Sequence, residues 1–135
     1  MKTEGINRFD YLMETPYAYR GRDAKTGLDC YGLVLEIYRA VGFDLPDYDY
    51  PYKPEAQGRL MAENYHKFWK RVEGWERIEN LMPFDLIRLY EEGPVANHIA
   101  VYLGDGWTIQ MSRSGAIKLP LKRIMRKAEG VYRLK

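Results

Sequence analysis

The pattern of hydrophobic and polar positions predicts its clearest helix over residues 30–41. Asp29 precedes this stretch, and an aspartate there can accept a hydrogen bond from the free amides of the first helical turn. Gly42 follows it and is a natural C-terminal stop. The apolar side chains that define the helix recur at helical spacing, at Leu33, Val34, Ile37, Tyr38 and Val41.

Two more helices are predicted in the first half of the chain. Residues 6–14 form a short one, which Pro16 ends. Residues 55–73 form a longer one, because Met61, Tyr65, Phe68 and Val72 step by four, three and four positions. Between the longer helices, residues 45–54 contain three prolines and cannot form a regular element.

The alternation of the second half predicts strands, the clearest being a hairpin over residues 98–112. Two alternating runs flank the turn residues 104–106, so that position i pairs with position 210 minus i. One face of this hairpin is apolar, and the other carries His98 and Gln110 on neighbouring positions. Further strands are predicted at 75–78, 84–90, 116–121 (an edge strand, because of Pro120) and 131–134, with a short helix over 122–128.

These elements indicate an α+β fold. Helices precede strands without alternating crossover units, so the helix over 30–41 should pack on an antiparallel sheet of about five strands. The length of 135 residues fits one domain spanning 1–135.

Composition and charge exclude several classes of protein. A net charge of +2 is too balanced for nucleic acid or a membrane as the main partner. No run approaches the roughly 18 apolar residues of a membrane span, and the polar first ten residues are no signal peptide. The lysines and arginines near the C-terminal end predict a solvated face: Lys118, Lys122, Arg123, Arg126 and Lys127.

Cys30 is the only cysteine, and it lies in the first turn of the predicted helix. There the helix dipole and free amides should make the thiol lose its proton more easily than at the free value of about 8.5. A thiolate is the nucleophile of a cysteine hydrolase. The alternative is a buried cysteine that acts as a small hydrophobe.

His98 is the candidate base, and Gln110 lies diagonal to it in the predicted hairpin, within side-chain reach. The alternative is a histidine that only bonds a neighbouring strand. His66 is off the apolar stripe of its helix and is predicted to be a surface residue. Two scattered histidines and one cysteine predict no metal site, and no cofactor is indicated.

Four segments resemble, in order and spacing, motifs of the NlpC-type cell-wall cysteine peptidases, which are small papain-like enzymes. Residues 16–21 resemble the family's Pro-Tyr-x-x-Gly-Gly, and residues 27–34 resemble its nucleophile motif. Residues 83–87 resemble its Pro-Gly-Asp-Leu-Val strand, and residues 97–106 its histidine strand. The run from 38 to 48 is similar to the versions carried by tailed phages and prophages.

The resemblance implies hydrolysis of an amide in the peptidoglycan stem peptide, typically a γ-D-glutamyl bond to a diamino acid. Cys30 would attack, His98 would transfer the proton, and Gln110 would orient the imidazole. The amide of Cys30 and the Tyr17 hydroxyl would bind the oxyanion. The remaining predicted substrate-binding residues are Tyr19, Arg20, Arg22, Asp29 and Tyr31, of which the two arginines would pair with stem-peptide carboxylates or stay solvated.

The chain departs from the family pattern at four positions. Tyr31 replaces the usual serine, a change associated with the phage branch, and Gln110 replaces the usual histidine. Arg20 and Phe84 stand where the motifs have glycine. Two other functions stay open: a thiol acyltransferase or deamidase on the same fold, and a structural tail-tip protein with a vestigial site. Without a signal peptide, the protein is expected to reach the wall in a virion, with phage tail proteins as partners, or after lysis.

Overall fold

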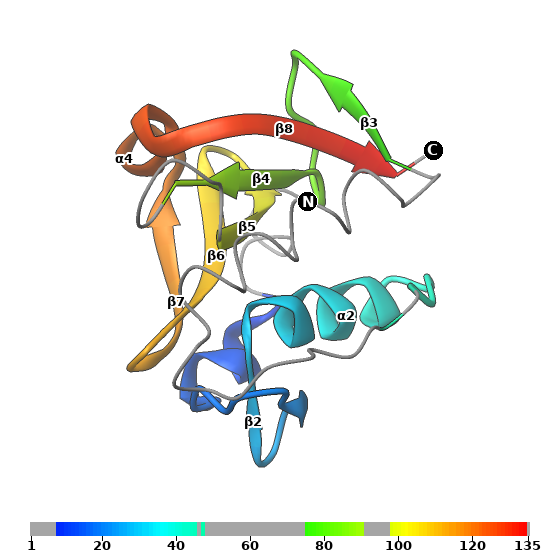
Figure 1. The fold of residues 1–135 in the computed structure, drawn as a ribbon, viewed down its shortest axis with the longest axis vertical. Helices are drawn as coiled ribbons and strands as arrows, with labels where there is room; N and C mark the ends of the chain where they lie inside the picture. The colour runs from blue at the N-terminus through cyan, green and yellow to red at the C-terminus, as the bar shows by residue number, and fades with distance from the viewer. Residues whose placement is uncertain (1–7, 46, 48–74, 91–97, 135) are drawn as a thin grey trace.

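The computed structural model describes residues 8–45, 47, 75–90 and 98–134 (Figure 1). The predicted helix over 55–73, with His66, and most of the proline-rich stretch lie outside the described residues. Among the described helices, none is long and apolar enough to cross a bilayer.

The fold is α+β, as predicted, but its main sheet has six strands rather than five. The strands are antiparallel, in the order β3-β8-β4-β5-β6-β7. The last strand, β8, inserts between β3 and β4 and begins three residues earlier than predicted, so it pairs with both neighbours. The strand bounds are Trp75–Ile78 (β3), Leu86–Leu89 (β4), His98–Gly104 (β5), Trp107–Ser112 (β6), Gly115–Pro120 (β7) and Ala128–Leu134 (β8).

The hairpin of β5 and β6 has the predicted register over most of its length. Ala100 pairs with Gln110, and Tyr102 pairs with Thr108. At the tip the register shifts, and Gly104 pairs with Trp107, so that the turn has two residues rather than three. Asp105 and Gly106 have φ of 51° and 81°, the left-handed backbone of a tight hairpin turn.

The helix α2 (Cys30–Ala40) packs against one face of the sheet (Figure 1). Leu33 and Ile37 of α2 share a buried cluster with the hairpin residues Ile99, Val101 and Ile109. This is the predicted apolar face of the hairpin, although Trp107 near its tip is 38% exposed. Burial of these side chains presses the first turn of α2 toward the hairpin.

The opposite face of the hairpin is also covered, which its polar residues did not indicate. The helix α4 (Leu121–Ile124) and the 3-10 turn η3 (Met125–Lys127) follow the edge strand β7. They contribute Ile124 to a second buried cluster with Ile87, Leu89, Ala100 and Val131. His98 and Gln110 are therefore buried, with exposures of 5% and 8%.

Two short elements differ from the prediction. The N-terminal helix is a 3-10 helix, η1 (Asp10–Glu14). The loop before α2 contains a small hairpin of β1 (Arg22–Asp23) and β2 (Gly27–Leu28), closed by a hydrogen bond from the Thr26 amide to the Asp23 carbonyl. Strands of two residues are too short for alternation to predict them.

Candidate active site

Cys30 is the first residue of α2, and its side chain is partly exposed. The carboxylate of Asp29 accepts a hydrogen bond of 2.7 Å from the Gly32 amide and caps the helix. This is the N-cap that the sequence predicted. The sulfur therefore lies at a helix start, where free amides and the helix dipole favour a thiolate.

His98 lies between Cys30 and Gln110. Its Nδ1 is 3.1 Å from the Cys30 sulfur, and its Nε2 is 2.5 Å from Oε1 of Gln110. A carbonyl oxygen only accepts, so Nε2 carries the proton of this bond, and Nδ1 faces the sulfur. The imidazole can therefore share the thiol proton while the amide holds its orientation.

Strand pairing places the His98 and Gln110 side chains next to each other. Leu89 of β4 pairs with His98, and Ala100 of β5 pairs with Gln110, which places the amide diagonal to the imidazole. A shift by one residue would turn both side chains to the other face. The bond between His98 and Gln110 is buried, so water competes little for it.

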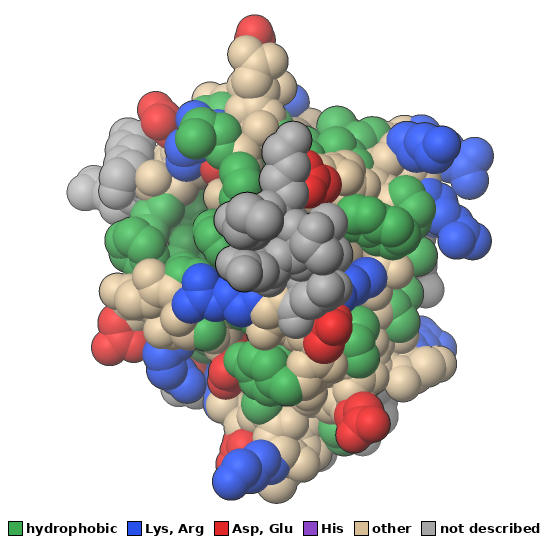
Figure 2. Space-filling model, turned by 180° about the vertical axis from the view of Figure 1, so that it is seen from behind, with side chains coloured by type: hydrophobic (Ala, Val, Ile, Leu, Met, Phe, Trp, Pro, Cys, Tyr) green, Lys and Arg blue, Asp and Glu red, His purple; other side chains and the backbone are tan. Residues whose placement is uncertain are grey.

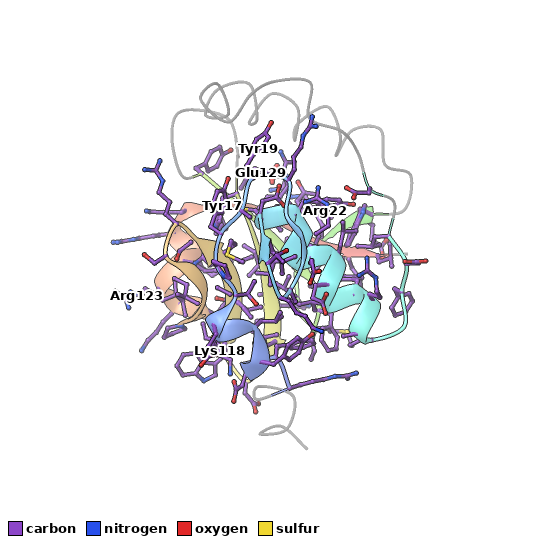
Figure 3. The ribbon with its side chains drawn as sticks, turned by 90° about the horizontal axis from the view of Figure 1, so that it is seen from below. Tyr17, Tyr19, Arg22, Lys118, Arg123 and Glu129 are labelled. Atoms are coloured by element: carbon purple, nitrogen blue, oxygen red, sulfur yellow. The ribbon has the colours of Figure 1, made fainter. Side chains whose placement is uncertain are left out.

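The loop over residues 16–27, which carries the predicted substrate-binding residues Tyr17, Tyr19, Arg20 and Arg22, is attached by main-chain hydrogen bonds to the segment just before α2. The Leu28 amide donates to the Pro16 carbonyl at 3.0 Å, and the Ala18 amide donates to the Leu28 carbonyl at 3.1 Å. Gly32 in the first turn of α2 lies so close to the Gly21 carbonyl that a side chain there would overlap it. Figure 3 shows Tyr17, Tyr19 and Arg22 along this path to α2.

Three of the predicted substrate-binding residues support the site from within. Asp29 is 1% exposed and accepts a 2.7 Å bond from Arg22, and Tyr31 is 2% exposed. The Arg22 guanidinium also bonds Asp47 at 2.9 Å and lies 5.8 Å from the centre of the Tyr31 ring. Asp29 and Tyr31 are therefore buried beneath the surface that was predicted to bind substrate, and their contact with substrate stays a prediction.

Burial, with the nearby Asp47 carboxylate, raises the pKa of Tyr31. Its hydroxyl therefore stays protonated throughout the ordinary pH range. Arg22 is paired with two carboxylates, and through Asp29 it supports the N-cap of α2. Nothing in the sequence pattern around Asp47 indicated its part in this cluster.

Tyr17, Tyr19 and Arg20 stay closer to the surface. Tyr17 and Tyr19 are half-buried against the main core cluster, and Arg20 is exposed, with its guanidinium 5.7 Å from the centre of the Tyr19 ring. Within the described ranges, no group of three His, Cys, Asp or Glu side chains forms a metal site. The site is thus a thiol, an imidazole and an amide beside a tyrosine-bearing loop.

Both positions where the family motifs have glycine adopt left-handed backbone. Arg20 has φ of 59° and Phe84 has φ of 76°. Glycine takes this conformation without strain, whereas other residues lose about 1–2 kcal/mol. Phe84 is held by a bond from its amide to the Tyr102 carbonyl, by the Tyr38 hydroxyl on its own carbonyl, and by edge contact with Phe9.

We expect Arg20→Gly to stabilise the protein. Relief of the left-handed strain exceeds the extra entropy of glycine in the unfolded chain, for a net gain of about 0.5–1 kcal/mol. Thermal unfolding should show a rise of about 3 °C in Tm. Arg20→Ala is the matched control, since it loses the same charge and the same contact with Tyr19 without relieving the backbone. Equal Tm values for the two variants would contradict the strain argument.

We expect native Cys30 to react with iodoacetamide at pH 7 roughly tenfold faster than the same thiol in unfolded protein. The helix start and the imidazole both favour the thiolate, and the sulfur is accessible. Mass spectrometry measures the rate at this single cysteine, and His98→Ala should slow it. A native thiol that reacts no faster than the unfolded one would show that the site does not activate it.

Comparison with known proteins points to one family. The model of the NlpC/P60 family matches residues 14–129. The chain is 32% identical over 111 residues to murein DD-endopeptidase MepH of Escherichia coli K12, covering 82% of this chain and 36% of that protein. The chain thus spans about a third of the length of this curated relative.

Solved structures show the same fold. The chain superposes on an NlpC/P60 family protein from Bacillus cereus with a TM-score of 0.65 and 22% identity, covering 99% of this chain and 40% of the other. The NlpC/p60 domain of peptidoglycan hydrolase SagA gives a TM-score of 0.61 and 16% identity, with 99% of each chain covered. The family model matches most of the chain, and we conclude that this protein belongs to the NlpC/P60 family.

Proposed function

We propose that this chain is a cysteine peptidase that hydrolyses amide bonds of peptidoglycan stem peptides through a Cys30 thioester. The observation that carries the proposal is the row formed by Cys30 at the start of α2, His98 on β5 and Gln110 on β6, with separations of 3.1 Å and 2.5 Å. Nucleophile, base and orienting group within such distances are the arrangement of an activated thiol.

In the proposed acylation, the Cys30 thiolate forms a bond to the substrate carbonyl carbon, and the carbonyl oxygen becomes negative. The Cys30 backbone amide, in the first turn where amides are not used within the helix, is placed to stabilise this oxyanion. The Tyr17 hydroxyl is a second candidate donor. His98 then gives its Nδ1 proton to the leaving amine as the carbon–nitrogen bond breaks.

In the proposed deacylation, His98 takes a proton from a water that attacks the thioester carbon. The carbon–sulfur bond breaks, and a carboxylic acid and the free thiol remain. Throughout, Gln110 accepts from Nε2 and keeps Nδ1 facing the sulfur. Papain-like enzymes use an amide in this position, so glutamine is compatible with the reaction.

The substrate class is supported by the named relatives. The Escherichia coli relative is a murein DD-endopeptidase, and the SagA domain comes from a peptidoglycan hydrolase. The resemblance of the motifs adds the expectation of a γ-D-glutamyl bond. The relative and the motifs thus indicate two different bonds of the same polymer, and analysis of the products decides between them.

Zymography on purified cell walls, followed by mass spectrometry of the products, tests the proposal. Hydrolysis adds one water to each cleaved amide, and the masses of the fragments identify the bond. Transfer or deamidation products would favour the thiol acyltransferase or deamidase instead. An intact wall with a folded protein would favour a structural role with a vestigial site.

We further propose that the chain acts from a phage tail. The support is the resemblance of residues 38–48 and the tyrosine at position 31 to the phage branch of the family. Mass spectrometry of purified virions from an induced host should then detect this protein together with tail proteins. Its absence from virions of a host that expresses it would contradict a tail location.

A further inference from the structure

A cavity of about 290 Å³ lies beside the catalytic row, on the side of His98 and Gln110 where α4 and η3 cover the sheet. His98, Gln110 and Ser112 supply its polar wall, and Cys30 is not part of it. The floor is apolar, formed by residues of the two clusters and of β7: Leu89, Met111, Ile117, Leu119 and Ile124.

Among the described residues that line this cavity, all the charged side chains are positive. Arg123, Arg126 and Lys127 line it, and no aspartate or glutamate of the described chain does. All three cations are exposed, and no carboxylate in the described part of the chain pairs with them. Figure 2 shows basic side chains gathered at the upper right, over α4 and η3. Part of the predicted solvated basic face therefore forms the rim of a cavity, whereas Lys118 is largely buried and pairs with Asp10.

The main chain holds this rim in place at both ends. The Leu121 amide donates to the Gly106 carbonyl at 2.7 Å, which ties α4 to the hairpin tip. The Tyr90 amide donates to the Lys127 carbonyl at 2.8 Å, which ties η3 to the end of β4. Between these bonds, the buried Ile124 anchors the segment. The backbone that carries the cations is thus held in place, so binding of a ligand needs to order only their side chains.

From this geometry we infer that the cavity is a subsite for a carboxylate-bearing part of the substrate peptide, held by Arg123, Arg126 and Lys127. The inference rests on the proposed function, because His98 both lines the cavity and contacts the Cys30 thiol. The volume suits one side chain or a short peptide end, since it lies at the lower limit for ligand sites. Guanidinium groups pair with carboxylates through two parallel hydrogen bonds, and the apolar floor accepts an aliphatic stem.

Peptide binding to the Cys30→Ala protein tests this inference, because binding then does not depend on turnover. The probes are a stem peptide with a free C-terminal carboxylate and the same peptide amidated there. Calorimetry at low salt should show about tenfold tighter binding of the acid, which corresponds to roughly 1.4 kcal/mol. Adding Arg123→Ala and Arg126→Ala should remove that preference, and Arg126→Glu should reverse it.

Lys122→Ala is the matched control, because Lys122 is an exposed cation on the same short helix that does not line the cavity. It should keep the preference for the acid. An equal loss in Lys122→Ala, or an unchanged preference in the double variant with its fold intact by circular dichroism, would overturn the subsite. Equal binding of both peptides refutes the subsite alone. Binding of neither peptide also refutes the subsite, whereas an intact wall in the zymography experiment refutes the proposed function.

Discussion

Cys30→Ala and His98→Ala are each expected to abolish hydrolysis of stem peptides, with a loss of at least about 10⁴-fold in kcat. The first removes the atom that bonds to the carbonyl carbon, and the second removes the group that carries the proton to the leaving amine. Because they act as one unit, the double variant should be no slower than either single variant. Release of free amine from one stem-peptide substrate measures all three.

The fold should survive these substitutions, which separates loss of chemistry from unfolding. Cys30 is partly exposed, so Cys30→Ala should leave the thermal unfolding curve nearly unchanged. His98→Ala leaves the buried Gln110 oxygen without its donor, which costs about 1–3 kcal/mol of stability. A folded Cys30→Ala protein with normal turnover would disprove the thioester mechanism.

Gln110→Ala is expected to slow the reaction without stopping it. Gln110 accepts from an imidazole that becomes charged, and hydrogen bonds to charged groups contribute about 1.5–3 kcal/mol. At about 1.4 kcal/mol per decade, kcat/KM should fall roughly 10- to 100-fold. Gln110→His restores a partner for Nε2 and should retain more activity than Gln110→Ala.

Thr108→Val is the matched control for Gln110→Ala. Thr108 lies two residues away on the same buried face of β6, and its hydroxyl donates to the Leu119 carbonyl rather than to the catalytic row. Its loss should lower stability and leave kcat/KM near the wild-type value. If Gln110→Ala proves fully active, Gln110 has only a structural role, and the imidazole is oriented by another group.

The departures from the family pattern have separate structural reasons. Tyr31 replaces a serine but turns into the core under Arg22, so its size is used for packing. Arg20 and Phe84 stand at left-handed positions where the motifs have glycine, and the contacts of their side chains and main chains offset the backbone strain. Gln110 alone departs from the family pattern within the proposed catalytic row, which is why its variants are the informative ones.

The sequence by itself determined the local parts of this protein. The side chain of Asp29 caps the helix and sets where α2 begins. Strict alternation set the register that places Gln110 diagonal to His98. Both signals act between near neighbours, so spacing alone predicts them. Proline at position 120 likewise marked β7 as an edge strand.

Only the tertiary structure decided what lies between distant segments. The bond from Cys30 to His98 spans 68 positions, and it forms because burial of the α2 stripe presses the helix start against the hairpin. Pairing of β8 between β3 and β4 fixed the order of the sheet, and it drew α4 and η3 over the polar face. That placement buried His98 and Gln110 and turned a basic run into the rim of a cavity. Such contacts depend on how the surfaces of distant segments pack together, and the spacing of residues along the chain does not predict that packing.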